Sequence, residues 1–167
     1  MQPLRKNINS HAFFSPGDDC LNAIVASIEE ASQSINICVF TISDDRISDA
    51  IVHAHRRGVR IRIITDNKKL HDTGSDIREL AARGLEVRID KTKSHMHHKF
   101  AIFDGLRVLT GSYNWTRSAA LYNHENILIT DNPGIVRDYS REFGRLWEDM
   151  MRYNPGGKSR NEFEDSW

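Results

Sequence analysis

The most constraining feature of the sequence is an alternation of strand-like and helix-like segments over residues 13–89. Residues 34–42 (SINICVFTI) and 59–65 (VRIRIIT) are rich in β-branched residues, which is typical of buried strands. Between them, residues 44–54 repeat isoleucine and alanine at helical spacing, and Gly58 is expected to end that helix. Strands that alternate with helices pack as helices on a largely parallel sheet. The sequence therefore predicts an α/β fold.

The second half of the chain predicts short strands and one long helix. The expected strands lie at 98–104, 107–110 and 125–130, and the expected helix at 133–151. Short strands that follow each other closely pair antiparallel, so the whole sheet is expected to be mixed. We expect an α/β/α sandwich with a central mixed β-sheet. It should form a single domain over residues 1–153, followed by a flexible tail over residues 154–167.

The residues best suited to catalysis lie in the stretch 97–125, HHKFAIFDGLRVLTGSYNWTRSAALYNHE. The polar and glycine positions with fixed spacing are His97, Lys99, Asp104, Gly111, Ser112, Asn114 and Glu125. Side chains two apart on a strand share a face, so the imidazole and the ammonium group should point the same way. A proton carrier beside a fixed positive charge, with hydroxyl and amide donors on the next loop, suits a phosphate group.

This spacing, H-x-K-x4-D-x6-G-S-x-N, resembles the signature of the phospholipase D superfamily, and every position of it is filled. The resemblance implies a phospholipase D-like fold and phosphodiester hydrolysis. It implies that His97 is the nucleophile and that Lys99 stabilises charge on the phosphate oxygens. Glu125 resembles the family's acidic residue after the loop, which holds the other imidazole nitrogen. Ser112 and Asn114 are expected to bind the phosphate.

Asp104 belongs to the same catalytic signature, but its position favours a second interpretation. It lies seven residues from His97, on the opposite side of one strand by parity, and it therefore suits a structural anchor for the following turn. His95 and His98 are expected at the surface or behind the site. No metal and no cofactor is required, because Lys99 supplies the positive charge that a metal ion supplies elsewhere.

One histidine cannot easily be both the nucleophile and the acid that protonates the leaving group. Larger members of the family resemble two copies of this domain, with one histidine from each, whereas this chain has one copy. The resemblance therefore implies a two-fold homodimer in which both His97 side chains face one shared site.

The substrate is less constrained than the reaction. The 23 basic and 23 acidic residues balance, but residues 53–69 hold six Arg and Lys residues against Asp66 alone, which favours a rim that attracts a polyanion. The minimal layout resembles the bacterial nonspecific endonuclease branch of the family. The mitochondrial branch is similar in size but carries an N-terminal membrane segment and a Cys/His zinc insertion that are not seen here. The favoured hypothesis is a metal-independent endonuclease that cleaves DNA, or both DNA and RNA, with little sequence preference.

Two alternatives stay open at this point. One is a phospholipid phosphodiesterase of the phospholipase D type, and the other is a nucleic-acid-binding module without turnover. Cys20 and Cys38 lie in apolar patterns and are expected to be buried free thiols. Because no apolar leader or membrane span is evident, the sequence predicts a cytoplasmic protein without stable membrane association, or a periplasmic or secreted one if a leader was removed.

Overall fold

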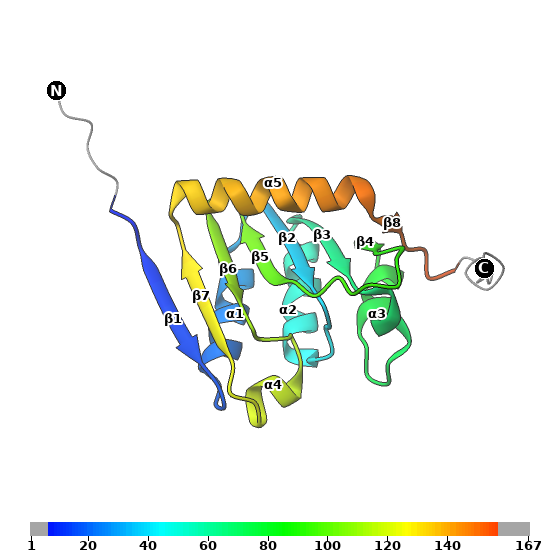
Figure 1. The fold of residues 1–167 in the computed structure, drawn as a ribbon, viewed down its shortest axis with the longest axis horizontal. Coiled ribbons are helices and arrows are strands. Elements are labelled where there is room, and N and C mark those ends of the chain that lie inside the picture. Colours follow the sequence, from blue (N-terminus) through cyan, green and yellow to red (C-terminus); the bar gives the residue numbers. More distant parts are fainter. Residues whose placement is uncertain (1–6, 157–167) are drawn as a thin grey trace.

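A computed structural model describes residues 7–156 and contains one eight-stranded sheet flanked by helices (Figure 1). The strands are β1 Ser10–Phe14, β2 Ser34–Val39, β3 Arg60–Thr65, β4 Glu86–Ile89, β5 Lys99–Phe103, β6 Arg107–Gly111, β7 Asn126–Thr130 and β8 Met151–Arg152. The helices are α1 Asp19–Glu30, α2 Asp45–Arg56, the 3₁₀ helix η1 Asn67–His71, α3 Ile77–Ala82, α4 Arg117–Leu121 and α5 Pro133–Asp149.

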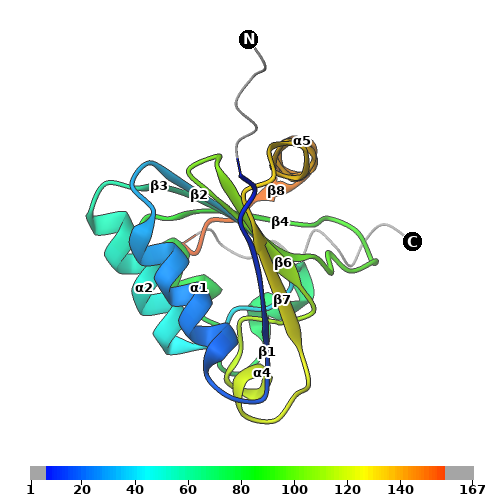
Figure 2. The same cartoon turned by 90° about the vertical axis from the view of Figure 1, so that its left-hand side faces the viewer.

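The sheet is mixed, in the order β1-β7-β6-β5-β2-β3-β4-β8. The pairs β2·β3 and β3·β4 are parallel, because a helix crosses over between their strands, whereas all other neighbours are antiparallel. Figure 2 shows α1 and α2 on one face of the sheet and α5 on the other. The expected α/β/α sandwich around a mixed sheet is confirmed.

Each face of the sheet has its own apolar core, as side-chain alternation along the strands requires. Ile35 and Ile37 of β2 pack with α1, α2 and α3, whereas Cys38 of the same strand packs with α5. Cys20 and Cys38 are buried and unbonded, as expected. Among the described residues, no helix has the length and apolar character needed to cross a bilayer.

The element boundaries differ from the expectations in a few places. The motif strand begins at Lys99 rather than at residue 98, and a 3₁₀ helix occupies part of the loop expected after β3. The edge strand β8 was not expected, because two residues that pair with β4 carry no periodic signal. Residues 157–167 of the predicted tail lie outside the described residues.

Candidate active site

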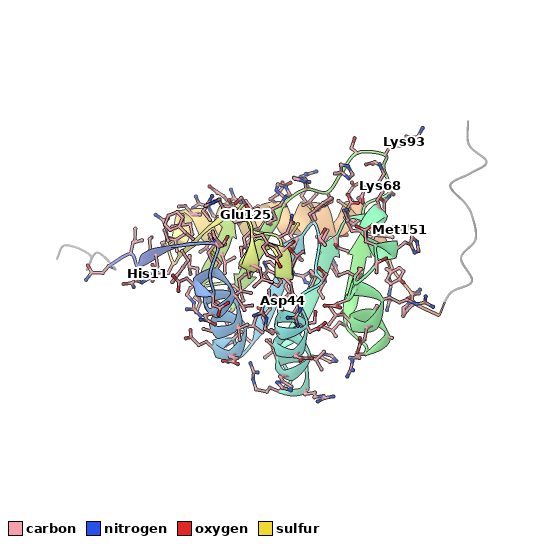
Figure 3. The ribbon with its side chains drawn as sticks, turned by 90° about the horizontal axis from the view of Figure 1, so that it is seen from below. His11, Asp44, Lys68, Lys93, Glu125 and Met151 are labelled. Atoms are coloured by element: carbon pink, nitrogen blue, oxygen red, sulfur yellow. The ribbon has the colours of Figure 1, made fainter. Side chains whose placement is uncertain are left out.

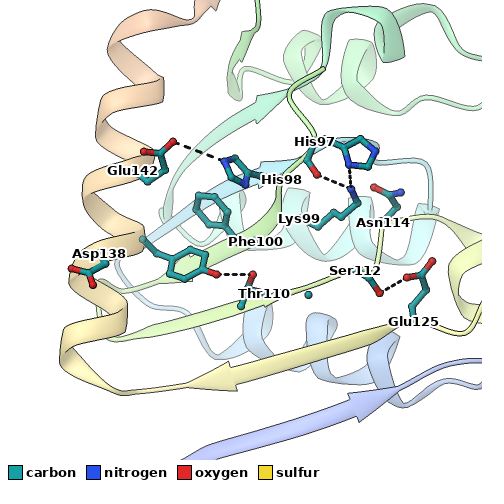
Figure 4. Close-up of a pocket in the computed structure, with 12 residues that line it drawn as sticks. His97, His98, Lys99, Phe100, Thr110, Ser112, Asn114, Glu125, Asp138 and Glu142 are labelled. Carbon is teal, nitrogen blue, oxygen red and sulfur yellow. Dashed lines mark hydrogen bonds and ion pairs between the residues drawn. The ribbon is translucent and has the colours of Figure 1, made fainter. Parts of the chain in front are cut away.

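An open cleft of about 670 Å³ lies where β5, β6 and the loop after β6 face α5. Figure 4 shows the residues that line it. They are His97, His98, Lys99, Phe100, Thr110, Gly111, Ser112, Asn114, Glu125, Asp138, Tyr139 and Glu142. The cleft therefore brings together five of the six predicted catalytic and substrate-binding residues.

His97 and Lys99 are in direct contact at one side of this cleft. Lys99 Nζ lies 2.9 Å from His97 Nδ1 and donates to the backbone carbonyl oxygen of His97 at 2.6 Å (Figure 4). Burial lowers the pKa of His97 below its ordinary value of 6.5, and the charges of Lys99 and His95 lower it further. The site therefore favours a neutral imidazole near neutral pH, as nucleophilic attack requires.

Phe40, directly after β2, forms a platform beneath this pair. Its ring centroid lies 4.5 Å from that of His97, and Lys99 Nζ lies 5.4 Å from the Phe40 centroid. The Phe40 N–H also donates to the His98 carbonyl oxygen at 2.9 Å, which fixes the residues next to the nucleophile. This role could not be predicted from the sequence, where Phe40 is only one residue of an apolar strand.

Ser112 and Glu125 meet across the loop that connects β6 to β7. The Ser112 hydroxyl donates to Glu125 Oε2 and accepts from the Asn126 N–H at 3.1 Å. Glu125 Oε1 also accepts from Asn123 Nδ2 at 3.4 Å. Within residues 7–156 the Glu125 carboxylate bonds these side chains and not His97, so the expected support of the imidazole by Glu125 stays a prediction.

Gly111 is required by the close approach of β6 to β7. A Cβ atom at this position would lie 2.0 Å from the Asn126 backbone oxygen, so no side chain fits without moving the backbone. The glycine places Ser112 against β7, where the Ser112 N–H donates to the same Asn126 oxygen at 3.0 Å. The Gly-Ser pair of the motif is thus a packing requirement that positions a hydroxyl.

Asn114 also lines the cleft, and one polar atom of its side chain has an unused hydrogen-bonding capacity. Within the described part of the chain, its side-chain oxygen is buried and has no hydrogen-bond partner. An amide group in that state has capacity for a ligand or a water molecule. This oxygen accepts and does not donate, so only the amide NH₂ group of Asn114 would donate to a phosphate, and the predicted role in phosphate binding stays a proposal.

Asp104 is the one predicted catalytic residue that the structure does not bring to the cleft. It lies at the far end of β5, in the turn to β6, with a positive φ of 55°. Its carboxylate accepts backbone N–H groups of Ser32, Gln33 and Ser34 at 2.7 to 3.2 Å. The geometry matches the anchor interpretation, because Asp104 ties the β5–β6 turn to the start of β2.

Asp66 organises the segment before the nucleophile, a role that could not be predicted from its place in the basic stretch. Its side chain is fully buried at the carboxyl end of β3. It accepts from the Met96 N–H at 3.0 Å and from the Lys68 N–H at 2.9 Å, and it contacts His95 Nδ1 at 3.2 Å. Asp66 therefore fixes the backbone one residue before His97.

The basic stretch over residues 53–69 is divided by the fold. Strand β3 spans about 20 Å, and it separates Arg56 and Arg57 at one end of the sheet from Lys68 and Lys69 at the other. Arg57 donates to three carbonyl groups at the end of α1, and Arg62 packs against α5 rings. The stretch therefore does not form one continuous basic surface beside the cleft. The prediction of a polyanionic substrate loses the charge cluster on which it relied.

The fold and the site together define a phospholipase D-like domain. The sequence profile described as "Cardiolipin synthase, PLD-like domain" matches residues 24–147, and the chain belongs to this family. Among solved structures, Nuc from Salmonella typhimurium, a phospholipase D family member, superposes with a TM-score of 0.83 at 25% identity, covering 89% of this chain and 99% of that one. The expected membership of the phospholipase D superfamily is confirmed.

Two relatives are similar over most of this chain. The mitochondrial cardiolipin hydrolase of Xenopus laevis is 46% identical over 139 residues, which are 82% of this chain and 66% of that protein. The protein of the same name from Chlamydomonas reinhardtii is 43% identical over 138 residues, which are 83% of this chain and 62% of that one. The chain thus spans less than two thirds of the length of these relatives.

These relatives overturn two expectations. The endonuclease hypothesis was wrong. It rested on a minimal layout that both branches share, on a membrane segment not seen in the sequence and on a basic stretch that β3 divides. The phospholipid alternative agrees better with the names of the relatives. The expected cytoplasmic location is contradicted too, because both names state a mitochondrial one.

Proposed function

We propose that the chain is a phospholipid phosphodiesterase of the phospholipase D type and that cardiolipin is its substrate. The observation that carries this proposal is the His97–Lys99 pair facing Ser112 and Asn114 across one cleft, in a chain 43–46% identical to proteins named cardiolipin hydrolase. The location that the names of these relatives support is mitochondrial.

In the proposed reaction the imidazole of His97 attacks one phosphorus atom of cardiolipin. A bond forms between nitrogen and phosphorus, and the bond from phosphorus to the bridging glycerol oxygen breaks. That oxygen takes a proton and leaves as phosphatidylglycerol. Water then attacks the phosphohistidine, the nitrogen–phosphorus bond breaks, and phosphatidic acid is released. Lys99, with Ser112 and Asn114, stabilises the charge on the phosphate oxygens in both steps.

The proton for the leaving group needs a second group beside His97. We propose a homodimer in which the His97 side chains of two copies face one shared site, so that one attacks while the other gives and then takes the proton. Glu125 is the proposed acceptor for the proton on the remaining imidazole nitrogen. It bonds Ser112 in the described structure, so this role requires an exchange of partners when substrate binds.

Product analysis from vesicles of cardiolipin and phosphatidylcholine tests the proposal. Phosphatidic acid and phosphatidylglycerol are expected in equal amounts early in the reaction, because each turnover on cardiolipin breaks one phosphodiester bond. Diacylglycerol or free fatty acid as the main product would point to a different bond and contradict the proposal. Failure of the folded protein to produce any lipid product would also contradict it.

A further inference from the structure

Four nitrogen-bearing side chains surround the Phe40 ring, and the proposed chemistry uses only two of them. These two are His97 and Lys99, as described above. Lys69 Nζ lies 5.1 Å from the Phe40 centroid, and the His95 ring centroid lies 5.4 Å from it. The Lys69 and Lys99 nitrogens are therefore no more than about 10.5 Å apart, the sum of their distances to the centroid.

Lys69 is carried by a segment that the fold holds in place. It belongs to η1, which begins after the buried Asp66. The Asn67 N–H donates to Asp90 Oδ1 at 2.7 Å, and Lys68 Nζ donates to the Lys93 carbonyl oxygen at 2.8 Å. Figure 3 shows Lys68 and Lys93 close together at one end of the molecule. These bonds tie η1 to the loop before β5, so the backbone that carries Lys69 is fixed relative to the nucleophile.

The Lys69 ammonium group is available to a ligand. Its partner is Asp72, at 2.7 Å, and the side chains are 29% and 48% exposed. The Asp72 carboxylate is about half exposed, so solvent screens this pair in part and weakens it. A phosphate group brought in by a substrate already bound at Lys99 can therefore displace Asp72 at small cost.

We infer that Lys69, beside the Phe40 ring, forms a second anion subsite. It binds one phosphate of cardiolipin while His97 and Lys99 act on the other. This inference rests on the proposed function and deepens it. Cardiolipin has two phosphates joined by a three-carbon glycerol bridge, whereas phosphatidylglycerol has one phosphate. The subsite would therefore make the enzyme prefer the lipid with two phosphates, through contacts that the catalytic motif does not contain.

The test compares initial rates on cardiolipin and on phosphatidylglycerol, in vesicles matched for surface charge. Lys69→Met should lower the cardiolipin-to-phosphatidylglycerol ratio by about tenfold, the loss expected for one charged contact. Asp72→Asn removes the competing carboxylate and should raise the ratio. Arg83→Met is the matched control, because Arg83 forms a similar exposed pair with Glu79 on α3, and it should leave the ratio unchanged.

Each other outcome overturns the inference. An unchanged ratio in Lys69→Met would show that no second phosphate is bound there. An equal fall on both lipids would show a general attraction to anionic vesicles instead of a subsite.

A separate measurement distinguishes failure of the proposed function from failure of the subsite. If the wild-type protein turns over neither lipid, the proposed function fails. Calorimetry with glycerol 1,3-bisphosphate and glycerol 3-phosphate still tests the subsite in that case. The wild type should bind the bisphosphate more tightly, and Lys69→Met should remove the difference. Equal affinities in the wild type would overturn the inference.

Discussion

Lys99 donates hydrogen bonds to both the ring and the backbone of His97, at 2.9 Å from Nδ1 and 2.6 Å from the carbonyl oxygen. The cation expected to bind phosphate is thus engaged with the nucleophile itself. A substrate phosphate offers Lys99 a charged acceptor in place of a neutral ring nitrogen, and charge-assisted bonds are the stronger ones. Substrate binding should therefore release the imidazole from Lys99.

The first prediction concerns the titration of His97. Burial and the Lys99 charge lower its pKa, so NMR should show its ring protons titrating below pH 6.5. In Lys99→Met the midpoint should move up toward 6.5, because removing a positive neighbour favours the protonated imidazole. Burial remains in that variant, so the shift should be partial. An unchanged or lower midpoint in Lys99→Met would contradict the electrostatic account.

Gly111 and Gly144 make a matched pair for testing the motif glycine. Gly111→Ala forces a Cβ atom to within 2.0 Å of the Asn126 oxygen and should lower the free energy of unfolding by about 2–3 kcal/mol. Gly144 lies exposed in α5 with no atom near its Cβ position, so Gly144→Ala should raise that energy by about 0.5–1 kcal/mol. Chemical denaturation measures the free energy of unfolding of both variants. Equal changes in Gly111→Ala and Gly144→Ala would contradict the packing argument.

The third prediction is that Asp104 stabilises the fold and does not catalyse. Partial burial alone would raise its pKa, but bonds from the Ser34, Gln33 and Ser32 N–H groups, with the Arg107 charge, bring it below 3.8. A carboxyl whose pKa is lower in the folded state than in the unfolded state stabilises the fold at pH values above its unfolded-state pKa. That stabilisation is lost as the pH falls through the folded-state pKa. Asp104→Asn should therefore cost about 1 kcal/mol at pH 7, after allowance for solvent screening.

Two measurements check this assignment. The stability difference between wild type and Asp104→Asn should shrink below about pH 4, where the carboxyl of the unfolded wild type binds a proton while that of the folded state stays ionised. The turnover number at neutral pH should remain within about twofold of wild type, because Asp104 does not line the cleft. A loss of turnover in a variant of wild-type stability would return Asp104 to the catalytic set.

The fourth prediction tests the division of the basic stretch. The Arg62 guanidinium lies 5.1 Å from the ring centroids of both Phe143 and Trp147, and its Nε donates to Asn36 Oδ1. Arg62→Met should lower the free energy of unfolding by about 1–2 kcal/mol and leave lipid turnover unchanged. The neighbouring Arg60 is exposed, so Arg60→Met should change stability by less than about 0.5 kcal/mol. Loss of turnover without loss of stability in Arg62→Met would place it in substrate binding.

Much of the fold and most of the candidate site could be predicted from the sequence. The alternation of strands and helices before residue 90 has strong periodic signals, so the elements are recognisable one by one. Five motif residues meet in the cleft because β5, β6 and the following loop are consecutive in the chain, and short connections leave few arrangements.

The parts that could not be predicted depend on contacts between distant segments. Phe40 and Asp66 follow parallel strands and reach His97 only because β2 pairs with β5 and lies beside β3. The basic stretch misled the substrate prediction, since it was counted along the chain although a full strand divides it. The substrate itself is not encoded in the motif, because any phosphodiester presents the same phosphate to His97 and Lys99.

The measurement that tests the account most directly is cardiolipin hydrolysis in excess EDTA by wild type, His97→Ala and His98→Ala. The two histidines are adjacent in the chain, but His98 packs against Phe100 and lies 3.9 Å from Glu142 instead of contacting Lys99. We expect turnover by the wild type, substantial turnover by His98→Ala, and none by His97→Ala. Turnover by His97→Ala at the wild-type rate, or cleavage of plasmid DNA with no lipid product by the wild type, would contradict the account.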